Sequence, residues 1–384
     1  MKRHQKTKIP VVLITGYLGS GKTTLLNELL LQEKRKVALI VNDMGSVNVD
    51  AKLLRSGNIA EKDTKMIELS NGCICCTLRE EFMQEVEKLS VRKDIEAVFV
   101  EASGVSDPAS VAEAFLAYQE MTPDTNIYLS SILTVVDADR IYREFLEQLE
   151  EKAQQEEDDD DGDDPDIINL VMDQIEFCNL IVLNKCDLLT ADQIGEVRRV
   201  IRQLQPEAEI IQSIRGKVNA DRILQGRKFD YGKAMNSSLI QKALKNSKEG
   251  GDYEGEYGIA SFVYEQQKPF DRDRFMKFIE EQYPAALIRA KGYLWFSDDA
   301  MHVQLFEQAG RNASVTEFSN WVAAFEEKDR QEVFENYPEV LEEWDETYGD
   351  RMNQIVFIGK GYDREEICRS LDGCIEEKEI ALCV

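Results

Sequence analysis

A complete phosphate-binding motif lies near the start of the chain, between an apolar run and a helix-forming run. Residues 16–23 read Gly-Tyr-Leu-Gly-Ser-Gly-Lys-Thr, which matches the pattern G-x-x-x-x-G-K-[ST]. Residues 11–15, rich in Val, Leu and Ile, predict a buried strand, and residues 24–31 are good helix formers. The order strand, loop, helix is the context in which this motif binds a nucleoside triphosphate, and it disfavours an ordinary glycine-rich turn.

The residue types of the motif fit the chemistry of phosphate binding. Glycines let backbone N–H groups approach the phosphates, and the following helix N-terminus adds positive potential. We expect Lys22 to contact the β- and γ-phosphates and the Thr23 hydroxyl to hold Mg²⁺. The predicted nucleotide contacts in this loop are Gly16, Gly19, Ser20, Gly21, Lys22, Thr23 and Thr24.

Two further strand ends complete a nucleotide site. An apolar run at residues 98–100 leads to Glu101, a carboxylate placed to hold Mg²⁺ directly or through water. A second run at residues 180–183 leads to Asn184, Lys185 and Asp187 in the pattern Asn-Lys-x-Asp. Asp187 can accept hydrogen bonds from guanine N1–H and the exocyclic amine, which adenine cannot offer, so the pattern predicts GTP over ATP.

Three cysteines follow within four positions, at Cys73, Cys75 and Cys76. Thiolates are preferred ligands of zinc and Cu(I), and a structural zinc site usually has four ligands. A three-thiolate site leaves one place for Asp43, another carboxylate, water or a client protein, and it suits metal transfer. Burial as small apolar side chains is the alternative, and we expect it instead for Cys178, Cys368, Cys374 and Cys383.

These motifs together resemble the CobW family of P-loop GTPases, in the class of the UreG and HypB metallochaperones. The resemblance rests on the phosphate loop, Asn-Gly-Cys-Ile-Cys-Cys at 71–76, Glu-Ala-Ser-Gly at 101–104 and the Asn-Lys-x-Asp pattern. It extends to residues 289–295 and 354–359, which are similar to the family's C-terminal domain. Residues 42–44 and 47–51 are similar to the ZagA-type zinc GTPases. Asp43 stands where many members carry Glu, so its role in orienting water, Mg²⁺ or the transferred metal stays open.

The spacing of apolar runs predicts an α/β fold. Strands at 11–15, 37–41, 97–100, 131–136, 180–183 and 210–212 with long crossovers predict a doubly wound, mainly parallel sheet of the P-loop NTPase type. We assign residues 1–225 to a GTPase domain and 226–257 to a linker. Residues 258–384 are assigned to a smaller α+β domain, which the resemblance identifies as the CobW C-terminal domain. Asp137 falls with the motifs along the edge where the strands end.

The charge balance limits the partners of the chain. Asp and Glu number 73 against 46 Lys and Arg, for a net charge of −27, which repels nucleic acid and anionic membranes. Nine acids fall in residues 156–166, within an insertion at about 150–166 that we expect to be disordered or to act as a weak tether. The basic N-terminus imitates a signal peptide, but cleavage would remove the phosphate loop, so we expect a cytoplasmic protein.

The sequence therefore predicts a GTP-hydrolysing metallochaperone that uses GTP, Mg²⁺ and Zn²⁺. We expect Lys22, Thr23, Glu101 and Asp43 to act in hydrolysis and the three clustered thiolates to carry zinc to a client metalloenzyme. Two alternatives remain: a chaperone of the same family directed at cobalt, and a non-catalytic zinc buffer or sensor in which GTP is a structural ligand. The sequence leaves open whether the chain forms a homo-oligomer.

Overall fold

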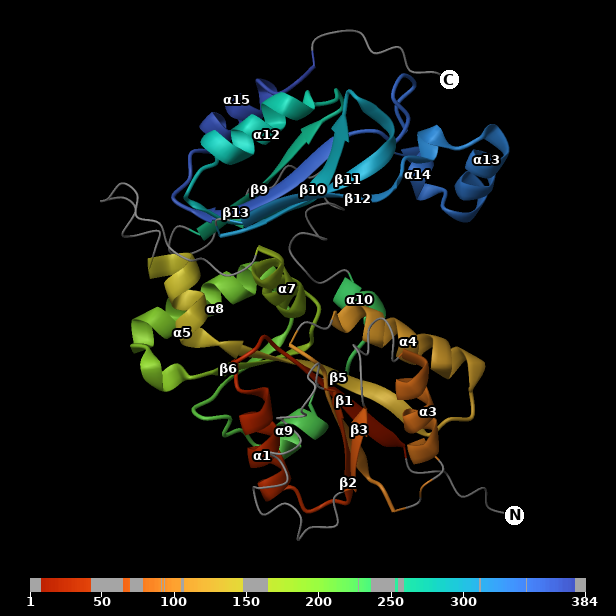
Figure 1. The fold of residues 1–384 in the computed structure, drawn as a ribbon, viewed down its shortest axis with the longest axis vertical. Helices are drawn as coiled ribbons and strands as arrows, with labels where there is room; N and C mark the ends of the chain where they lie inside the picture. The colour runs from red at the N-terminus through yellow and green to blue at the C-terminus, as the bar shows by residue number, and fades with distance from the viewer. Residues whose placement is uncertain are drawn as a thin grey trace. The chain divides into compact units, whose positions relative to one another are not determined.

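The computed structural model describes residues 8–42, 65–69, 79–90, 92, 94–104, 107–147, 165–226, 228–235, 253–254, 259–310, 312–342 and 344–376. Contacts divide the chain into two compact units (Figure 1). One comprises Met1–Glu147 with Leu170–Leu239, and the other comprises Gln148–Asn169 with Ile240–Val384. No helix in the described ranges is long and apolar enough to cross a membrane.

The first unit is built on a sheet of seven strands that all pair in parallel. In spatial order they are β3 (Lys65–Leu69), β2 (Val37–Asn42), β4 (Ala97–Glu101), β1 (Ile9–Thr15), β5 (Ile127–Asp137), β6 (Leu180–Asn184) and β7 (Glu209–Gln212). The chain starts in the middle at β1 and adds strands on both sides. This order confirms the predicted doubly wound α/β fold, and it brings the carboxyl ends of all seven strands to one edge.

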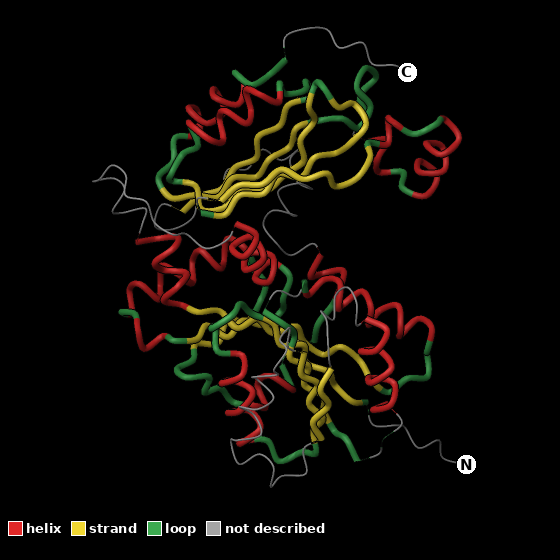
Figure 2. Tube along the Cα trace, viewed as in Figure 1, coloured by secondary structure: helices red, strands yellow, loops and turns green. Residues whose placement is uncertain are grey.

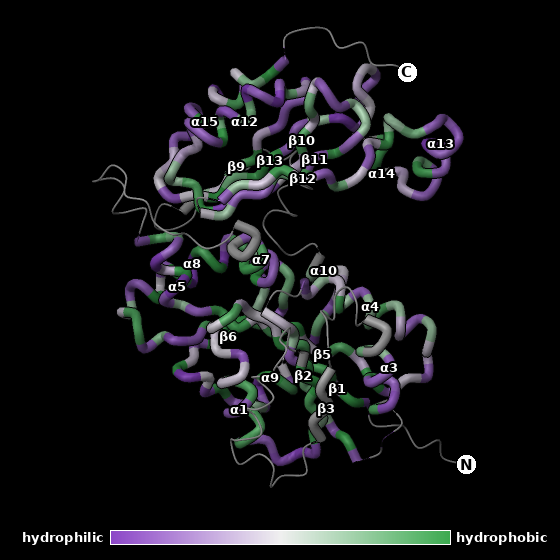
Figure 3. Tube along the Cα trace, viewed as in Figure 1, coloured by the Kyte–Doolittle hydropathy of each residue, from purple (hydrophilic) through white to green (hydrophobic). Residues whose placement is uncertain are grey.

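Helices cover both faces of this sheet (Figure 2). They are α1 (Lys22–Gln32), α3 (Arg79–Ser90), α4 (Pro108–Met121), α5 (Ala138–Tyr142), α7 (Pro165–Glu176), α8 (Ala191–Leu204), α9 (Ala220–Leu224) and α10 (Tyr231–Met235). Helices α1 and α9 pack with Val12 and Ile14 in one apolar core, and α3 contacts α4 through Phe82 and Phe115, whose ring centroids lie 5.6 Å apart. The strands are the most hydrophobic segments (Figure 3), as expected for a sheet buried on both faces.

Two strand predictions in this unit need correction. Strand β3, the outermost strand beside β2, has no counterpart among the predicted strands. Strand β5 begins at Ile127, four residues before the predicted start at 131. The range assigned to a linker also contains structure, since α10 and the short strand β8 (Tyr253–Glu254) both fall inside it.

The second unit is an antiparallel sheet backed by helices. Its strands, in spatial order, are β12 (Asn312–Asn320), β11 (Asp299–Ala309), β10 (Leu287–Phe296), β13 (Asn353–Lys360), β9 (Ile259–Gln266) and β8. Helices α12 (Arg272–Glu281) and α15 (Arg364–Asp372) pack on it through Phe275, Phe278, Ile367 and Leu371. Helices α13 (Glu327–Asn336) and α14 (Glu339–Glu342) follow β12 in the chain. The α+β class is as predicted. The sequence also predicts strands at 259–264, 287–296, 301–306 and 354–358, and the polar strand β12 has no counterpart among them.

Candidate nucleotide site

The phosphate loop joins β1 to α1, as its sequence predicts. Gly16 and Gly21 adopt φ values of 136° and 103°, a region that residues with a Cβ rarely enter. A Cβ on Gly16 would lie 2.4 Å from the carbonyl oxygen of Val135, and one on Gly21 would lie 2.4 Å from Nδ2 of Asn184. Glycine is therefore required at both positions, by backbone conformation and by close packing.

The side chains of this loop point to an anionic ligand. Lys22 is buried, and its Nζ donates to the carbonyl oxygens of Gly16 at 2.7 Å and Tyr17 at 3.2 Å. The hydroxyl of Ser20 is buried and has no hydrogen-bond partner among the described residues. A buried polar group without a partner is destabilising, so a phosphate oxygen at this loop would both satisfy Ser20 and draw the ammonium of Lys22.

Thr23 and Glu101 form an oxygen-rich pair beside the phosphate loop. Parallel pairing of β1 with β4 sets Ile14 opposite Glu101, and Glu101 is almost fully buried at the end of β4. The Thr23 hydroxyl donates to Oε1 of Glu101 at 3.2 Å. A hydroxyl and a carboxylate are ligands that Mg²⁺ prefers, so the donor set fits the ion.

The Asn-Lys-x-Asp pattern begins where β6 ends and connects two loops. The Asn184 amide donates from Nδ2 to the carbonyl oxygen of Ser20 and accepts at Oδ1 from the backbone N–H of Gly216, both at 3.0 Å. Asp187 lies exposed on the short helix Cys186–Leu188. The geometry therefore brings the predicted base-reading segment and the phosphate loop to the same place, with Asn184 between them.

Four predicted site residues lie outside the described residues: Asp43, Cys73, Cys75 and Cys76. The three-thiolate site and the role of Asp43 therefore stay predictions. Within the described ranges, no group of three or more His, Cys, Asp or Glu side chains is arranged to hold a metal ion.

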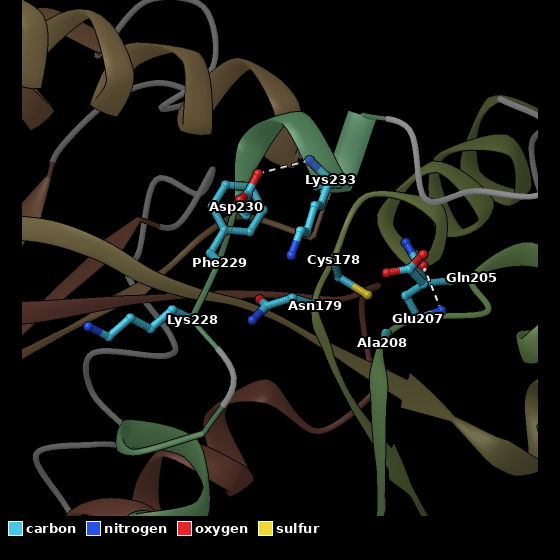
Figure 4. A pocket seen from close by; sticks show the side chains of 10 residues that line it. Cys178, Asn179, Gln205, Glu207, Ala208, Lys228, Phe229, Asp230 and Lys233 are labelled. Atoms are coloured by element: carbon cyan, nitrogen blue, oxygen red, sulfur yellow. Dashed lines mark hydrogen bonds between the residues drawn. The ribbon is translucent and has the colours of Figure 1, made fainter. Parts of the chain in front are cut away.

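A cavity of about 290 Å³ lies at the opposite edge of the same sheet, at the amino ends of β6 and β7 (Figure 4). Its lining includes Cys178, Asn179, Phe229 and Lys233. Because the nucleotide loops follow the carboxyl ends of the strands, this cavity is separate from the nucleotide site. Burial raises the pKa of Cys178 to about 12, so its thiol stays protonated near neutral pH and is a poor metal ligand. Cys178 and Cys374 are buried, as predicted, whereas Cys368 is only partly buried, and Cys383 lies outside the described residues.

Two contacts of the site had no functional assignment from sequence. Nζ of Lys185 lies 2.6 Å from Oδ2 of Asp137, and the guanidinium carbon of Arg140 lies 3.9 Å from the ring centroid of Tyr17. The position of Asp137 at a strand end was the available signal. Nothing in the pattern indicated Arg140, because its partner lies in a different segment of the chain.

Comparison with known proteins agrees with this geometry. Residues 10–212 match the family model described as the CobW/HypB/UreG nucleotide-binding domain, and residues 259–375 match the cobalamin synthesis protein CobW C-terminal domain. The chain is 32% identical over 388 residues to zinc-regulated GTPase metalloprotein activator 1 of Dictyostelium discoideum, which covers 96% of this chain and 80% of that protein.

Two bacterial relatives are named zinc chaperone CobW. The one from Sinorhizobium is 31% identical over 76% of this chain and 79% of its own length. The one from Pseudomonas aeruginosa is 32% identical over 55% of this chain and 58% of its own length. The two family models, the parallel sheet and the phosphate loop agree: the chain belongs to the CobW/HypB/UreG family and is a P-loop GTPase.

Proposed function

We propose that this GTPase binds zinc on Cys73, Cys75 and Cys76 and delivers it to a client metalloenzyme as GTP is hydrolysed. Its relatives are named as a zinc-regulated metalloprotein activator and as zinc chaperones, and thiolates are ligands that zinc prefers. We infer a cytoplasmic protein whose main partner is that client, with neither nucleic acid nor membrane as a partner. The net charge of −27 supports the exclusion of both polyanions.

The observation that carries the proposal is the register of β2 and β3. These strands pair in parallel with Asn42 opposite Leu69, and both are the last residues of their strands. In the sequence, Asp43 follows one strand end directly and the cysteines follow the other. The two segments therefore leave neighbouring points on the edge that also carries the phosphate loop, which supports a metal site close to the nucleotide and Asp43 as its fourth ligand.

The described residues supply the groups that GTP hydrolysis requires. We propose that Lys22 stabilises charge on the β- and γ-phosphates and that Asp187 accepts hydrogen bonds from guanine. Thr23 and Glu101 would hold Mg²⁺, which neutralises phosphate charge when bound. Because segments next to the phosphates respond to the γ-phosphate in P-loop GTPases, the nucleotide state can alter the affinity for zinc, and zinc must then alter the affinity for GTP by the same factor.

The experiment is a zinc competition assay with a chromophoric chelator, run with GTP, with a non-hydrolysable GTP analogue, with GDP and without nucleotide. We expect one tight site per chain, an affinity that differs between nucleotide states by about 1–3 kcal/mol, and faster zinc release with GTP than with its analogue. Exchange of Cys73, Cys75 and Cys76 for Ser should abolish the site. The matched control is Cys178→Ser with Cys374→Ser, which should leave zinc binding intact.

The same assay separates the two alternatives. Equal zinc affinity and equal release in all nucleotide states, with the site intact, would identify a buffer and contradict the transfer mechanism. Lys22→Ala should bind zinc normally yet lose the GTP-dependent release. Repeating the titration with Co²⁺ tests the metal: tighter binding of cobalt than zinc under matched conditions would replace the zinc assignment with the cobalt one.

A further inference from the structure

One carboxylate at the end of β5 contacts two parts of the nucleotide site. Oδ2 of Asp137 accepts from the ammonium of Lys185 at 2.6 Å, and Oδ1 accepts from the backbone N–H of Arg140 at 3.3 Å. The first contact reaches the Asn-Lys-x-Asp segment, whose Asn184 lies opposite Asp137 in the β5–β6 pairing. The second contact caps helix α5, because the side chain of the residue just before a helix can accept from the free N–H groups of its first turn.

Lys185 is held in an unusual backbone conformation by this environment. Its φ of 58° and ψ of 30° are left-handed, and such a conformation costs a non-glycine residue about 1–2 kcal/mol. The strained turn starts the short helix that carries Asp187. The ion pair with Asp137 has little solvent access on the carboxylate side, which is 14% exposed. A charge-assisted bond at this position therefore fixes the turn that orients Asp187.

Arg140 extends the connection to the phosphate loop. Its guanidinium carbon lies 3.9 Å from the ring centroid of Tyr17, and its Nε donates to Oε1 of Glu144 at 2.6 Å. A guanidinium over an aromatic face is attractive, and Glu144 limits where the guanidinium can move. Tyr17 follows Gly16 in the loop, and its carbonyl oxygen accepts from Lys22. Arg140 thus fixes the residue whose backbone holds the phosphate-binding lysine.

We propose that Asp137 and Arg140 are positioning residues that connect guanine recognition to the phosphate loop. Asp137 sets guanine selectivity through Lys185, and Arg140 sets the turnover rate through Tyr17. The two residues are structurally connected, because the Asp137 carboxylate that pairs with Lys185 also caps helix α5, which carries Arg140. The inference rests on the proposed guanine site at Asp187, and the experiments below separate the failure of one from the failure of the other.

The first experiment measures the affinities for GDP and ADP by calorimetry. Asp137→Ser keeps a helix-capping side chain but is too short to reach Lys185. We expect its preference for GDP over ADP to fall about tenfold, with ADP affinity unchanged. Asp137→Asn keeps the cap and a neutral contact with Lys185, so its selectivity should lie between that of the wild type and that of Asp137→Ser. The control is Asp139→Asn, a neighbouring acid that pairs with exposed Arg143 and should leave selectivity unchanged.

The outcomes are distinct. A wild-type protein that binds GDP and ADP equally would remove the guanine site itself. A selective wild type with unchanged selectivity in folded Asp137→Ser and Asp137→Asn would overturn the role of Asp137. Thermal unfolding of each variant establishes that it is folded, and Asp137→Asn, which retains both shape and cap, decides the matter if the Ser variant is unstable.

The second experiment is a double-mutant cycle on GTP hydrolysis. Arg140→Gln and Tyr17→Leu should each lower kcat about tenfold, and the double variant should be no slower than either one, because both changes break a single contact. Arg140→Lys keeps a cation over the ring and should retain most of the rate. Arg143→Gln, on the same segment, is the control and should hydrolyse GTP normally. Multiplicative losses in the double variant, or an Arg140→Lys variant as slow as Arg140→Gln, would show that Arg140 does not act through the ring of Tyr17 and would overturn the positioning role.

Discussion

At the scale of single residues, Asn184 connects the phosphate loop to the segment predicted to read the base. Its amide bonds to the phosphate loop at Ser20 and to the loop at Gly216, so a change in one segment reaches the other. The residues predicted for this region follow ligand chemistry closely, since a phosphate needs glycines and a lysine, and guanine needs an acceptor. Arg140 and Tyr17 could not be predicted, because a contact between a cation and a ring leaves no sequence pattern.

The base preference is the most direct prediction at this scale. Asp187→Asn replaces an acceptor of two hydrogen bonds with a group that also donates. We expect the variant to lose affinity for GTP by at least about a hundredfold and to gain affinity for xanthosine triphosphate, because xanthine carries an acceptor where guanine carries its amine. Calorimetric titration with the two nucleotides measures the exchange. Unchanged GTP affinity would show that Asp187 does not face the base.

Cys178 predicts a pH dependence of stability. Its pKa is raised by burial from 9.0 to about 12, so the folded state holds the proton while the unfolded state releases it. The contribution of this thiol to the unfolding free energy is therefore fully present below pH 9. It declines as pH rises toward 12, by about 1.4 kcal/mol per pH unit at most. Urea unfolding at pH 7.5 and pH 10.5 should show a smaller loss for Cys178→Ala than for the wild type, by about 2 kcal/mol. Equal losses in both proteins would contradict the role of this thiol.

At the scale of elements, the predicted strands are those with continuous β-branched and aliphatic runs. Strand β3 reads Lys-Met-Ile-Glu-Leu and β12 is exposed along residues 316–320, so neither carries such a run. Both lie at an edge of their sheet, where a strand has one neighbour and less apolar surface to bury. Edge strands are therefore what the sequence pattern missed in both units, and β3 is the one that matters for the proposed metal site.

Gly292 allows a test of how tightly the second sheet is packed. It lies in β10 opposite Ile355 of β13, and a Cβ there would come within 2.1 Å of the Gln354 carbonyl oxygen. Because that oxygen belongs to the backbone, the strands must separate to accept Gly292→Ala. We expect a loss of about 1–3 kcal/mol in unfolding free energy, the usual cost of overpacking, measured by denaturant unfolding. Gly232→Ala is the control and should cost less, because among the described residues its Cβ would come no closer than 3.6 Å, to Asp230 Oδ1.

At the scale of the whole molecule, net charge is the dominant long-range property. The chain carries −27, and a compact state with one sign of charge in excess is destabilised by self-repulsion. Nine of these charges come from residues 156–166, so exchanging those acids for their amides leaves −18. Each of the two units has its own apolar core. At low ionic strength the free energy gained by burying that core must exceed the cost of this repulsion.

Salt should therefore stabilise the protein. Raising NaCl from about 10 mM to about 500 mM shortens the screening length from about 30 Å to under 5 Å, which removes most of the repulsion between distant acids, so the thermal midpoint should rise. Since repulsion scales with the square of net charge, the amide variant should show roughly half the rise of the wild type. A control variant in which each Asp of residues 156–166 is replaced by Glu, and each Glu by Asp, keeps the net charge and should respond to salt like the wild type. If salt lowers the midpoint, attraction between opposite charges governs stability. If the midpoint of the amide variant rises as much as that of the wild type, the acidic segment contributes nothing to the repulsion.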